Sequence, residues 1–575
     1  MKRIKSLLAV CLVLSVLFTA AGCKKVVTYP DAVYSDIYSD IVVYNDIYTD
    51  DYEDSYDDDE SSSESTTTST NDFVVDDAFD YGMDEDEVKI FGGTDIAGGK
   101  AFTVAEFGAK GDGKTDDSEA INAAISMAKE YIAENPQKKA EIRFEKNKTY
   151  VSINAAVTIA DAKNIALVGN NTTIIGNPKK QYVIIDRSAN ISVKGFNFTY
   201  VYPVAYTAKT TAVDSHKAVF EVPKWFTECV KKDPSVPAES FGIRADGQRN
   251  HAYIMEYKVI DDTHCEIAFR TNRPNVGDYM YIPTPGYSHV STAFQISHNT
   301  GAVKYENVNI WNASSFTFHI TNNKGKLNFY NVKVVPRDSN SSATVSWRDV
   351  MHAKDNRESI TVDKCVFKGS HDDIFNLSNT WCQVTEVGDD NELMLYGLDY
   401  NGFCPTILEG DTAVVIDPYV GAYYGEAKVV EVTITSAGNA RIRLDRDLGI
   451  EGGEYICFKE LAAPGSKIMN SQFEGTYRIK AAAKIENCDF KVLLMWMAYS
   501  GQNSTVEGPI PENITFTNCR FTPTEGRDGV RLFNFTCETI AGDPDTDYHV
   551  KNIVFNKCTF SEGIIDKSDP NIKIK

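Results

Sequence analysis

Short segments in which apolar and polar residues alternate recur along the chain, from about residue 150 to its end. Alternation with a period of two predicts β-strands that bury one face. The segments recur at irregular intervals of roughly 20–40 residues, and turn residues often follow them, which is typical of a solenoid of parallel strands. Examples are Ala189-Asn-Ile-Ser-Val, Glu306-Asn-Val-Asn-Ile, Glu358-Ser-Ile-Thr-Val, Glu512-Asn-Ile-Thr-Phe and Lys551-Asn-Ile-Val-Phe.

Two stretches interrupt this repeat. Residues 206–294 and 383–461 contain strand-like runs such as Gly277-Asp-Tyr-Met-Tyr-Ile and Gly410-Asp-Thr-Ala-Val-Val-Ile. Their pattern is that of consecutive antiparallel strands, so we predict a small β-barrel in each. The solenoid itself is then expected to comprise residues 99–205, 295–382 and 462–575.

A helix is predicted at the start of the folded part. Thr115-Asp116 supplies candidate N-cap residues, and apolar residues follow at helical spacing: Ile121, Ala124, Ile125, Ala128 and Ile132. The preceding run, Phe107-Gly-Ala-Lys-Gly-Asp-Gly-Lys-Thr-Asp-Asp-Ser-Glu-Ala-Ile121, resembles the amino-terminal signature of the pectate-lyase-like β-helix superfamily. The resemblance implies that this helix caps the solenoid. We therefore expect an all-β fold: a right-handed parallel β-helix with an N-terminal capping helix and two inserted antiparallel β-barrel-like domains.

The first 98 residues have a different character. Residues 1–23 read as an export signal, with a basic start, an apolar stretch and the end Thr19-Ala-Ala-Gly-Cys23. This end resembles a bacterial lipobox, which implies cleavage before Cys23, lipidation of its thiol and a membrane-anchored lipoprotein at the cell surface. An ordinary signal peptide with an incidental Cys is the alternative. Residues 24–98 carry 22 Asp and Glu against three Lys, and a Ser/Thr run, so we predict a disordered tether.

Charge and cysteine content exclude other classes. The net charge is −23, most of it in the tether, and there is no basic patch, so nucleic acid is not an expected partner. No CxxC pair occurs, which argues against a zinc site. Cys365, Cys488, Cys519 and Cys558 each stand two residues before a Phe, a recurrence that predicts small core residues stacked in successive coils.

Three aspartates are the candidate chemistry. Asp372 and Asp373 are adjacent, and Asp349 precedes Asp372 by 23 residues. That spacing is close to one coil, and neighbouring strands lie about 4.8 Å apart, so the three carboxylates are expected to meet. Paired carboxylates serve glycoside hydrolysis as acid and base, and an inverting enzyme holds them about 6.5–9.5 Å apart. A purely structural role, in which these acids bond loop backbone, is the alternative.

The layout resembles β-helical glycoside hydrolases. Family 28 polygalacturonases have one Asp a coil before an Asp pair. The closer likeness is to family 110, the inverting α-1,3-galactosidases, which have a β-helix with two inserted barrels and an Asp-Asp-x-x-Asn motif, here Asp372 to Asn376. The family usually has His-Gly after this motif, where this chain has Ser378-Asn379. The resemblance implies that Asp372 is the general acid, that Asp349 and Asp373 activate water, and that a terminal α-linked galactose is released.

Further residues are candidates for substrate binding. By resemblance, Arg478 and Glu507 hold sugar groups; the alternatives are a salt bridge across coils for Arg478 and a turn for Glu507. Asn376 either orients a carboxylate or joins an internal Asn ladder, and His371 stands beside the Asp pair. Trp381 and Trp496 are candidate stacking residues or core residues. No metal or organic cofactor is expected. Three other functions stay open at this point: a polygalacturonase-like hydrolase, a calcium-dependent polysaccharide lyase with Arg348 or Arg478 as base, and a non-catalytic glycan-binding or adhesive β-helix.

Overall fold

The computed structural model describes residues 99–575 apart from 237–240, 245–251, 271–272, 288–290, 338–343, 399–403, 418–421, 437, 499–506, 525–526, 537–549, 569 and 571. The predicted signal peptide, the lipidation site Cys23 and the tether 24–98 lie outside the described residues. Their roles, with the surface location that they imply, stay predictions. Among the described helices, none has the length and apolar character needed to cross a membrane.

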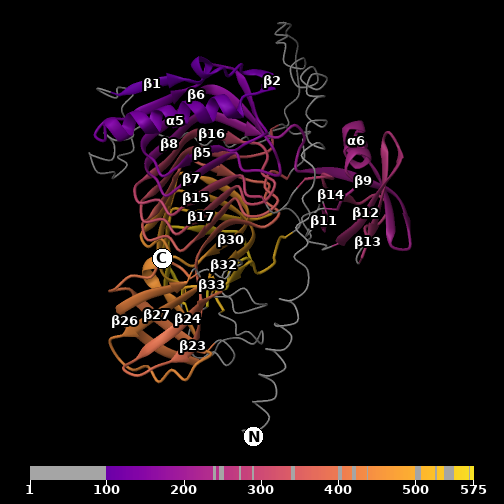
Figure 1. The fold of residues 1–575 in the computed structure, drawn as a ribbon. Coiled ribbons are helices and arrows are strands. Elements are labelled where there is room, and N and C mark those ends of the chain that lie inside the picture. The colour runs from indigo at the N-terminus through magenta and orange to yellow at the C-terminus, as the bar shows by residue number, and fades with distance from the viewer. Residues whose placement is uncertain are drawn as a thin grey trace. The chain divides into compact units, whose positions relative to one another are not determined.

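One large sheet system of parallel strands forms the solenoid (Figure 1). Its first strands are β1 (Lys100–Thr103), β2 (Asp112–Asp116), β3 (Ala140–Arg143), β4 (Thr149–Ser152), β5 (Val157–Ala160), β6 (Lys163–Gly176), β7 (Val183–Asp186) and β8 (Ala189–Thr199). Its middle strands are β15 (Phe294–Ser297), β16 (Val303–Ile310), β17 (Phe318–Thr321), β18 (Leu327–Val334), β19 (Met351–Lys354), β20 (Ile360–Asp363), β21 (Val366–Phe367) and β22 (Asp373–Thr380).

The last fifth of the chain continues the same system. It contributes β29 (Ser466–Met469), β30 (Gln472–Ile479), β31 (Ala483–Glu486), β32 (Asp489–Trp496), β34 (Glu512–Thr517), β35 (Arg520–Pro523), β36 (Phe533–Asn534), β37 (Lys551–Asn556), β38 (Thr559–Phe560) and β39 (Ile572–Ile574). The short β33 (Glu507–Gly508) instead pairs antiparallel with the end of β22. The predicted parallel β-helix is therefore confirmed.

Aligned apolar residues fill the interior of the coils. The pairing of β15 with β17 sets Phe294 beside Phe318, whose rings stack at 5.0 Å, and the pairing of β16 with β18 sets Tyr305 beside Phe329 at 5.6 Å. All four side chains are buried. Each coil therefore fixes the next by matching a large side chain to a large side chain, and this register carries over to the outward-facing positions.

Helix α5 (Ser118–Glu134) covers the first coils, as predicted. Its buried residues include all five of the predicted stripe: Ile121, Ala124, Ile125, Ala128 and Ile132. The start was predicted too early, since residues 115–116 close β2 and Asp117 is the N-cap. The Asp117 carboxylate instead accepts bonds from the Lys110 and Gly111 N–H groups at 2.6 and 3.3 Å and so closes the Gly-rich turn. A 3₁₀ turn, η1 (Val104–Phe107), precedes it.

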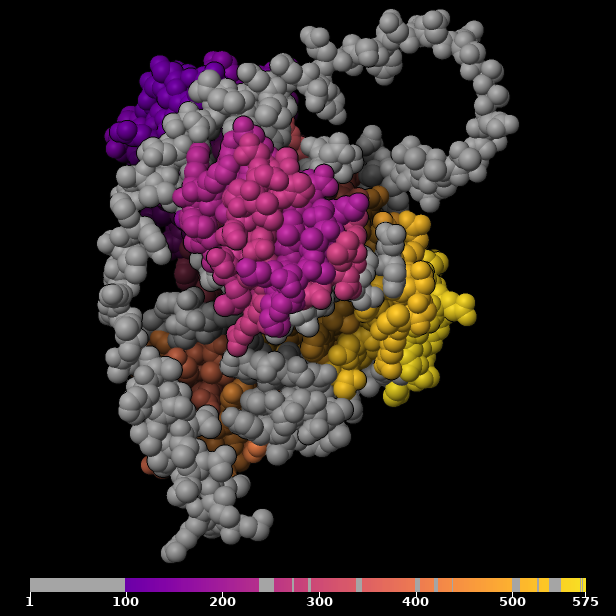
Figure 2. All heavy atoms as spheres, turned by 90° about the vertical axis from the view of Figure 1, so that its right-hand side faces the viewer, coloured from indigo at the N-terminus to yellow at the C-terminus, as the bar shows by residue number. Residues whose placement is uncertain are grey.

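Two closed antiparallel barrels interrupt the solenoid, in agreement with the predicted fold class. The first, whose outer surface Figure 2 shows in magenta, comprises β9 (Ala205–Asp214), β10 (Lys217–Glu221), β11 (Phe241–Arg244), β12 (Ala252–Asp261), β13 (His264–Phe269) and β14 (Tyr279–Pro283), with helix α6 (Lys224–Lys232). The second comprises β23 (Cys382–Val387), β24 (Glu392–Gly397), β25 (Thr412–Asp417), β26 (Ala422–Ser436), β27 (Asn439–Leu444) and β28 (Tyr455–Phe458), followed by η2 (Lys459–Leu461). Helix α6 was not predicted.

Polar and thiol side chains also stack from coil to coil. Asn299, Asn323 and Asn356 form a buried ladder in which each amide bonds the next at 2.9 and 2.8 Å. Cys365, Cys488 and Cys519 are buried as predicted, and Cys558 is half-buried. Their thiols donate to backbone carbonyl groups, and the nine described cysteines are all free. These ladders are core structure, and Asn376 does not belong to the Asn ladder.

Candidate active site

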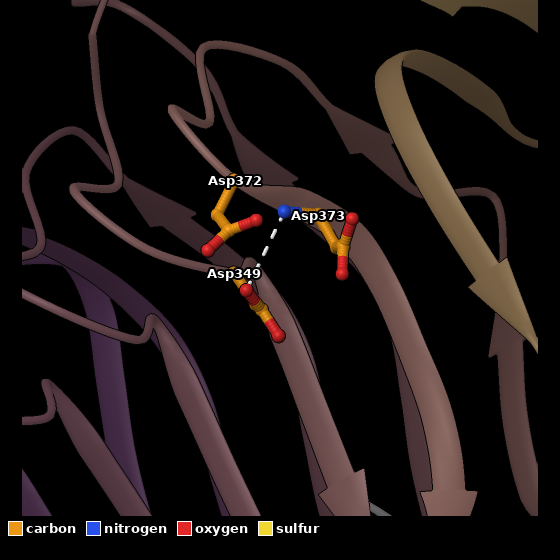
Figure 3. Close-up of side chains that lie close together, drawn as sticks. All are labelled: Asp349, Asp372 and Asp373. Carbon is orange, nitrogen blue, oxygen red and sulfur yellow. Dashed lines mark hydrogen bonds between the residues drawn. The ribbon is translucent and has the colours of Figure 1, made fainter. Parts of the chain in front are cut away.

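The three predicted aspartates meet where β19 and β22 begin (Figure 3). One oxygen from each carboxylate lies within 4.8 Å of the others. The N–H of Val350 donates to the carbonyl oxygen of Asp373 at 2.8 Å, and the N–H of Asp373 donates to Asp349 Oδ1 at 3.4 Å. Backbone pairing between successive coils therefore holds Asp349 against the Asp pair, as the 23-residue spacing predicted.

The carboxylates differ in burial and in partners. Asp349 and Asp373 are each 2 % exposed, whereas Asp372 is half-buried. Asp349 Oδ2 lies 2.7 Å from His352 Nδ1, and Asp373 Oδ2 forms an ion pair with Arg478 Nε at 2.7 Å. Among the described residues, none donates a hydrogen bond to the Asp372 carboxylate or pairs with it. Asp372 is thus the member of the trio whose oxygens are left for a ligand.

Burial and crowding favour protonation of the inner pair. Burial raises the pKa of Asp349 well above its ordinary value, and the nearby Asp372 charge adds to this. Burial also raises the pKa of Asp373. The positive charge of Arg478 works against this rise, and the negative charges of Asp372 and Asp349 add to it. Carboxyl groups this close titrate together, so the proton belongs to the cluster rather than to one residue. Burial, reinforced by Lys354, lowers the pKa of His352 to about 3, so its imidazole is neutral near pH 7.

The separation of acid and base stays a prediction. The 4.8 Å limit joins the nearest oxygen of each carboxylate, whereas the roughly 6.5–9.5 Å typical of inverting glycosidases separates the two carboxyl groups. Asp372 and Asp373 are neighbours in the chain, and the coil bond from Asp373 to Asp349 draws the third carboxylate inward. The carboxylate spacing therefore gives no support to inversion by itself.

A row of outward-facing residues extends the site across four strands. The strand register sets His352, Asn376, Arg478 and Trp496 side by side on β19, β22, β30 and β32. The guanidinium of Arg478 lies over the Trp496 ring at 5.0 Å. On the other side, the Phe316 ring stacks on His352 at 4.3 Å and faces His319 at 5.4 Å. The carboxylates are therefore bordered by aromatic and cationic groups, a surface suited to a sugar.

Glu507 joins this row from a distant part of the chain. Strand β33 pairs Glu507 with Thr380 at the end of β22, and the side chain is 3 % exposed. Its carboxylate contacts Lys354, Asn376, Arg478 and Lys480 at 3.0–3.3 Å. Burial alone would raise its pKa, but the Lys354, Lys480 and Arg478 charges outweigh burial and hold the pKa well below its ordinary value. Glu507 is therefore an anion near pH 7.

Two predicted residues lie deeper than expected. His371 is 4 % exposed, with Nε2 2.6 Å from Thr344 Oγ1 and its ring 4.3 Å from Trp347 and 5.4 Å from Tyr281 of β14. It connects the segment before β22 to the first barrel, and a role in substrate binding stays a prediction. Trp381 is fully buried, so stacking on a sugar was the wrong alternative for it and core packing is the correct one.

Ser378 and Asn379, which depart from the family pattern, have defined contacts. Ser378 Oγ donates to Asn376 Oδ1 at 2.9 Å, and Asn379 Nδ2 donates to the Phe458 carbonyl oxygen at 2.7 Å. A Cβ at the neighbouring Gly508 would lie 2.8 Å from Asn379 Oδ1, so Gly is required for this packing. Ser378 thus orients Asn376, and Asn379 connects β22 to β28, the last strand of the second barrel.

Sequence reasoning missed three residues of the site: His352, Lys354 and Lys480 in its structural role. The signal was the coil spacing, because His352 precedes Asn376 by 24 residues and Lys354 precedes Ser378 by the same number. Aligning coils from the Asp motif outward would have placed both in the site. Lys480 stands two residues after Arg478 in the chain, and the sequence analysis assigned it no role.

The trio also resembles a cation site in the types of its ligands, since carboxylate oxygens suit Ca²⁺. Its partners fit a metal poorly. The Arg478 guanidinium lies 2.7 Å from one of the Asp373 oxygens, and a second cation there would meet its charge. His352 Nδ1 lies 2.7 Å from one oxygen of Asp349, so that oxygen is already occupied as well. The arrangement fits acid–base work on water better than metal binding.

Comparison with curated proteins finds relatives with one shared name. The chain is 21 % identical over 336 residues to "Alpha-1,3-galactosidase A" of Bacteroides thetaiotaomicron. The aligned segment covers 54 % of this chain and 58 % of the relative. It is 24 % identical over 260 residues to the protein of that name from Akkermansia muciniphila, covering 41 % and 42 %. The match to the Bacteroides fragilis protein is 28 % over 150 residues, 25 % of this chain and 24 % of the relative. The predicted resemblance to α-1,3-galactosidases is thus confirmed, over 58 % or less of each relative's length.

No protein-family model matches the chain. Among solved structures, an endo-xylogalacturonan hydrolase from Aspergillus tubingensis aligns with a TM-score of 0.36 at 9 % identity, covering 82 % of this chain and 88 % of that one. An exopolygalacturonase from Thermotoga maritima aligns with 0.33 at 10 % identity, covering 80 % and 88 %. Similarity at this level carries no information on substrate.

Replacing Asp349 with Asn should stabilise the protein. The folded state raises the pKa of Asp349 above the roughly 3.9 of an unfolded chain, so the folded protein binds the proton more tightly and loses stability as pH rises through that interval. Asn keeps an acceptor for Asp373 and carries no charge. We expect Asp349→Asn to melt a few degrees higher than wild type, with a gain that grows from about pH 5 to pH 8.

Thermal unfolding of both proteins at the two pH values measures this effect. Asp372→Asn is the matched control, because the half-buried Asp372 has less desolvation to relieve and should gain less. A variant Asp349→Asn that melts below wild type at the higher pH would show that Asp349 contributes stabilising charge instead.

Proposed function

We propose that the chain is a glycoside hydrolase that releases terminal α-1,3-linked galactose. Asp372 donates a proton to the glycosidic oxygen, and Asp349 and Asp373 hold and deprotonate the attacking water. The observation that carries the proposal is the unequal state of the three carboxylates. Two are buried and held by His352 and Arg478, while Asp372 is half-buried and unpaired among the described residues.

The geometry gives each residue a task. A general acid needs an accessible oxygen at the leaving group, which suits Asp372. The inner carboxylates are fixed by His352 and Arg478, so a water between them would meet two acceptors of set orientation. A proton held within the carboxylate cluster is the condition for acid catalysis, and the raised pKa values of Asp349 and Asp373 favour such a proton.

The galactose specificity rests on the relatives. Three curated proteins similar to this chain bear the name "Alpha-1,3-galactosidase A". We extend that substrate to this chain as a proposal, with exo action on the terminal residue. A glycan in the site would border Trp496 and Arg478 on one side and Phe316 on the other.

The Asp372→Asn substitution should abolish turnover while preserving the fold. Loss of a positioned acid costs about 10²–10⁴-fold in rate. Galactose released from α-1,3-galactobiose is the measurement, with the melting temperature as a check of folding. Asp363→Asn is the control, since Asp363 is a buried solenoid aspartate that accepts a bond from Asn470 at 2.9 Å, away from the trio.

Other outcomes point to the other functions. Near-normal turnover in Asp372→Asn would remove Asp372 from the mechanism. Activity abolished by a chelator, with unsaturated products that absorb ultraviolet light, would favour the calcium-dependent lyase. Glycan binding by wild type with no sugar release over long incubation would favour the adhesive protein.

We also expect the released galactose to be the inverted β-anomer. Retention would require one carboxylate to attack the sugar carbon, but the two inner carboxylates are 2 % exposed and each has an oxygen 2.7 Å from its nitrogen partner. Water is the smaller nucleophile and fits this enclosure. Proton NMR of the first product formed distinguishes the anomers, and initial α-galactose would show a covalent intermediate.

A further inference from the structure

Every acceptor position of Glu507 is already taken. Oε1 lies 3.0 Å from Lys354 Nζ and accepts a bond from Asn376 Nδ2 at 3.1 Å. Oε2 accepts bonds from Arg478 Nη1 at 3.3 Å and Lys480 Nζ at 3.2 Å. A carboxylate offers about four lone-pair positions. None is left for a sugar hydroxyl, so the structure assigns Glu507 a role other than direct substrate binding.

The cations around Glu507 need an anion. Lys480 is fully buried and Lys354 is 7 % exposed, and buried ammonium groups are costly without a partner. They come from separate coils: Lys354 ends β19, and Lys480 follows β30. Burial lowers the pKa of Lys480 to about 8, and the Glu507 charge works against this fall. Glu507 therefore offsets the positive charge of both lysines.

The Glu507 carboxylate, held between Lys354, Arg478 and Lys480, affects which sugars the site can accept. Arg478 contacts Glu507 and Asp373 together, so it connects the basic cluster to the catalytic trio. An acidic sugar is recognised by placing its carboxylate on such a cluster. Here that place holds a protein carboxylate, and a second negative charge beside it would be repelled in a poorly solvated environment.

We propose that Glu507 is a built-in counter-anion that occupies the basic cluster of Lys354, Arg478 and Lys480 and so restricts the site to neutral sugars. The proposal rests on the proposed glycosidase function and names the substrate class of that site. It predicts that removal of the Glu507 side chain creates a binding site for small carboxylates.

Binding is tested first, without reference to activity. Glu507→Ala should melt several degrees below wild type, because buried lysines lose their partner. Acetate or galacturonate at about pH 6, below the pKa of about 8 of Lys480, should raise the melting temperature of the variant by more than galactose does. Wild type should respond to neither carboxylate. Glu507→Gln keeps the volume of the side chain and should show no rescue by acetate.

Selectivity is tested next with paired aryl α-galactoside and α-galacturonoside substrates. Glu507→Ala should lower the preference for the neutral substrate by about tenfold or more, equivalent to about 1.4 kcal/mol. Asp411→Asn is the matched control: Asp411 forms a buried pair with Arg357 at 2.7 Å in the second barrel. It should lose stability with no change in selectivity.

The two tests separate the possible failures. A folded Glu507→Ala protein with no carboxylate rescue and unchanged selectivity would overturn the proposal and leave Glu507 a purely structural residue. Wild type that cleaves neither substrate would overturn the proposed hydrolase, while the acetate measurement still decides the role of Glu507. Where Glu507→Ala does not fold even in acetate, Glu507→Gln replaces it in the selectivity assay: with the negative charge gone, the preference for the neutral substrate should fall, and a preference equal to that of wild type would contradict the proposal.

Discussion

The balance of buried charge along β19 and β22 is the constraint on which the site depends. Asp349, Asp372, Asp373 and Glu507 bring four carboxylates together, and Lys354, Arg478 and Lys480 bring three cations. Neutral His352 adds no charge. One proton shared by the carboxylates makes the cluster neutral, and the raised pKa values of Asp349 and Asp373 agree with that. The proton that reduces the buried charge is thus the same one that the proposed acid catalysis requires.

The solenoid makes this crowding possible. Matched aromatic side chains inside the coils, such as Phe294 on Phe318, fix the register, and the register places charged side chains of successive coils side by side. Residues far apart in sequence then act as neighbours. The coils on either side of the second barrel still pair directly, since β22 lies beside β30 with one irregularity between Asp373 and Phe375, although the barrel lies between them in the chain.

The sequence alone predicted those features whose residues are close in the chain or one coil apart. The α5 stripe, the Cys stack and the Asp trio follow from the periods of a helix and of one coil. It was insufficient where an insertion hid the spacing. Asn376 and Arg478 are register neighbours separated by 102 residues, and Glu507 arrives on an antiparallel strand that no coil period predicts. Resemblance to a family indicated both residues, but their contacts needed the structure.

The account stands on one shared proton in the carboxylate cluster near neutral pH, which NMR can observe directly. Protein labelled with ¹³C at the aspartate side-chain carboxyl carbons is titrated from about pH 4 to 9, well above the ordinary aspartate pKa of roughly 3.9. We expect one aspartate signal to titrate well above the ordinary aspartate range and to disappear in an Asp349→Asn or Asp373→Asn variant. Titration of every aspartate below about pH 5 would contradict the account.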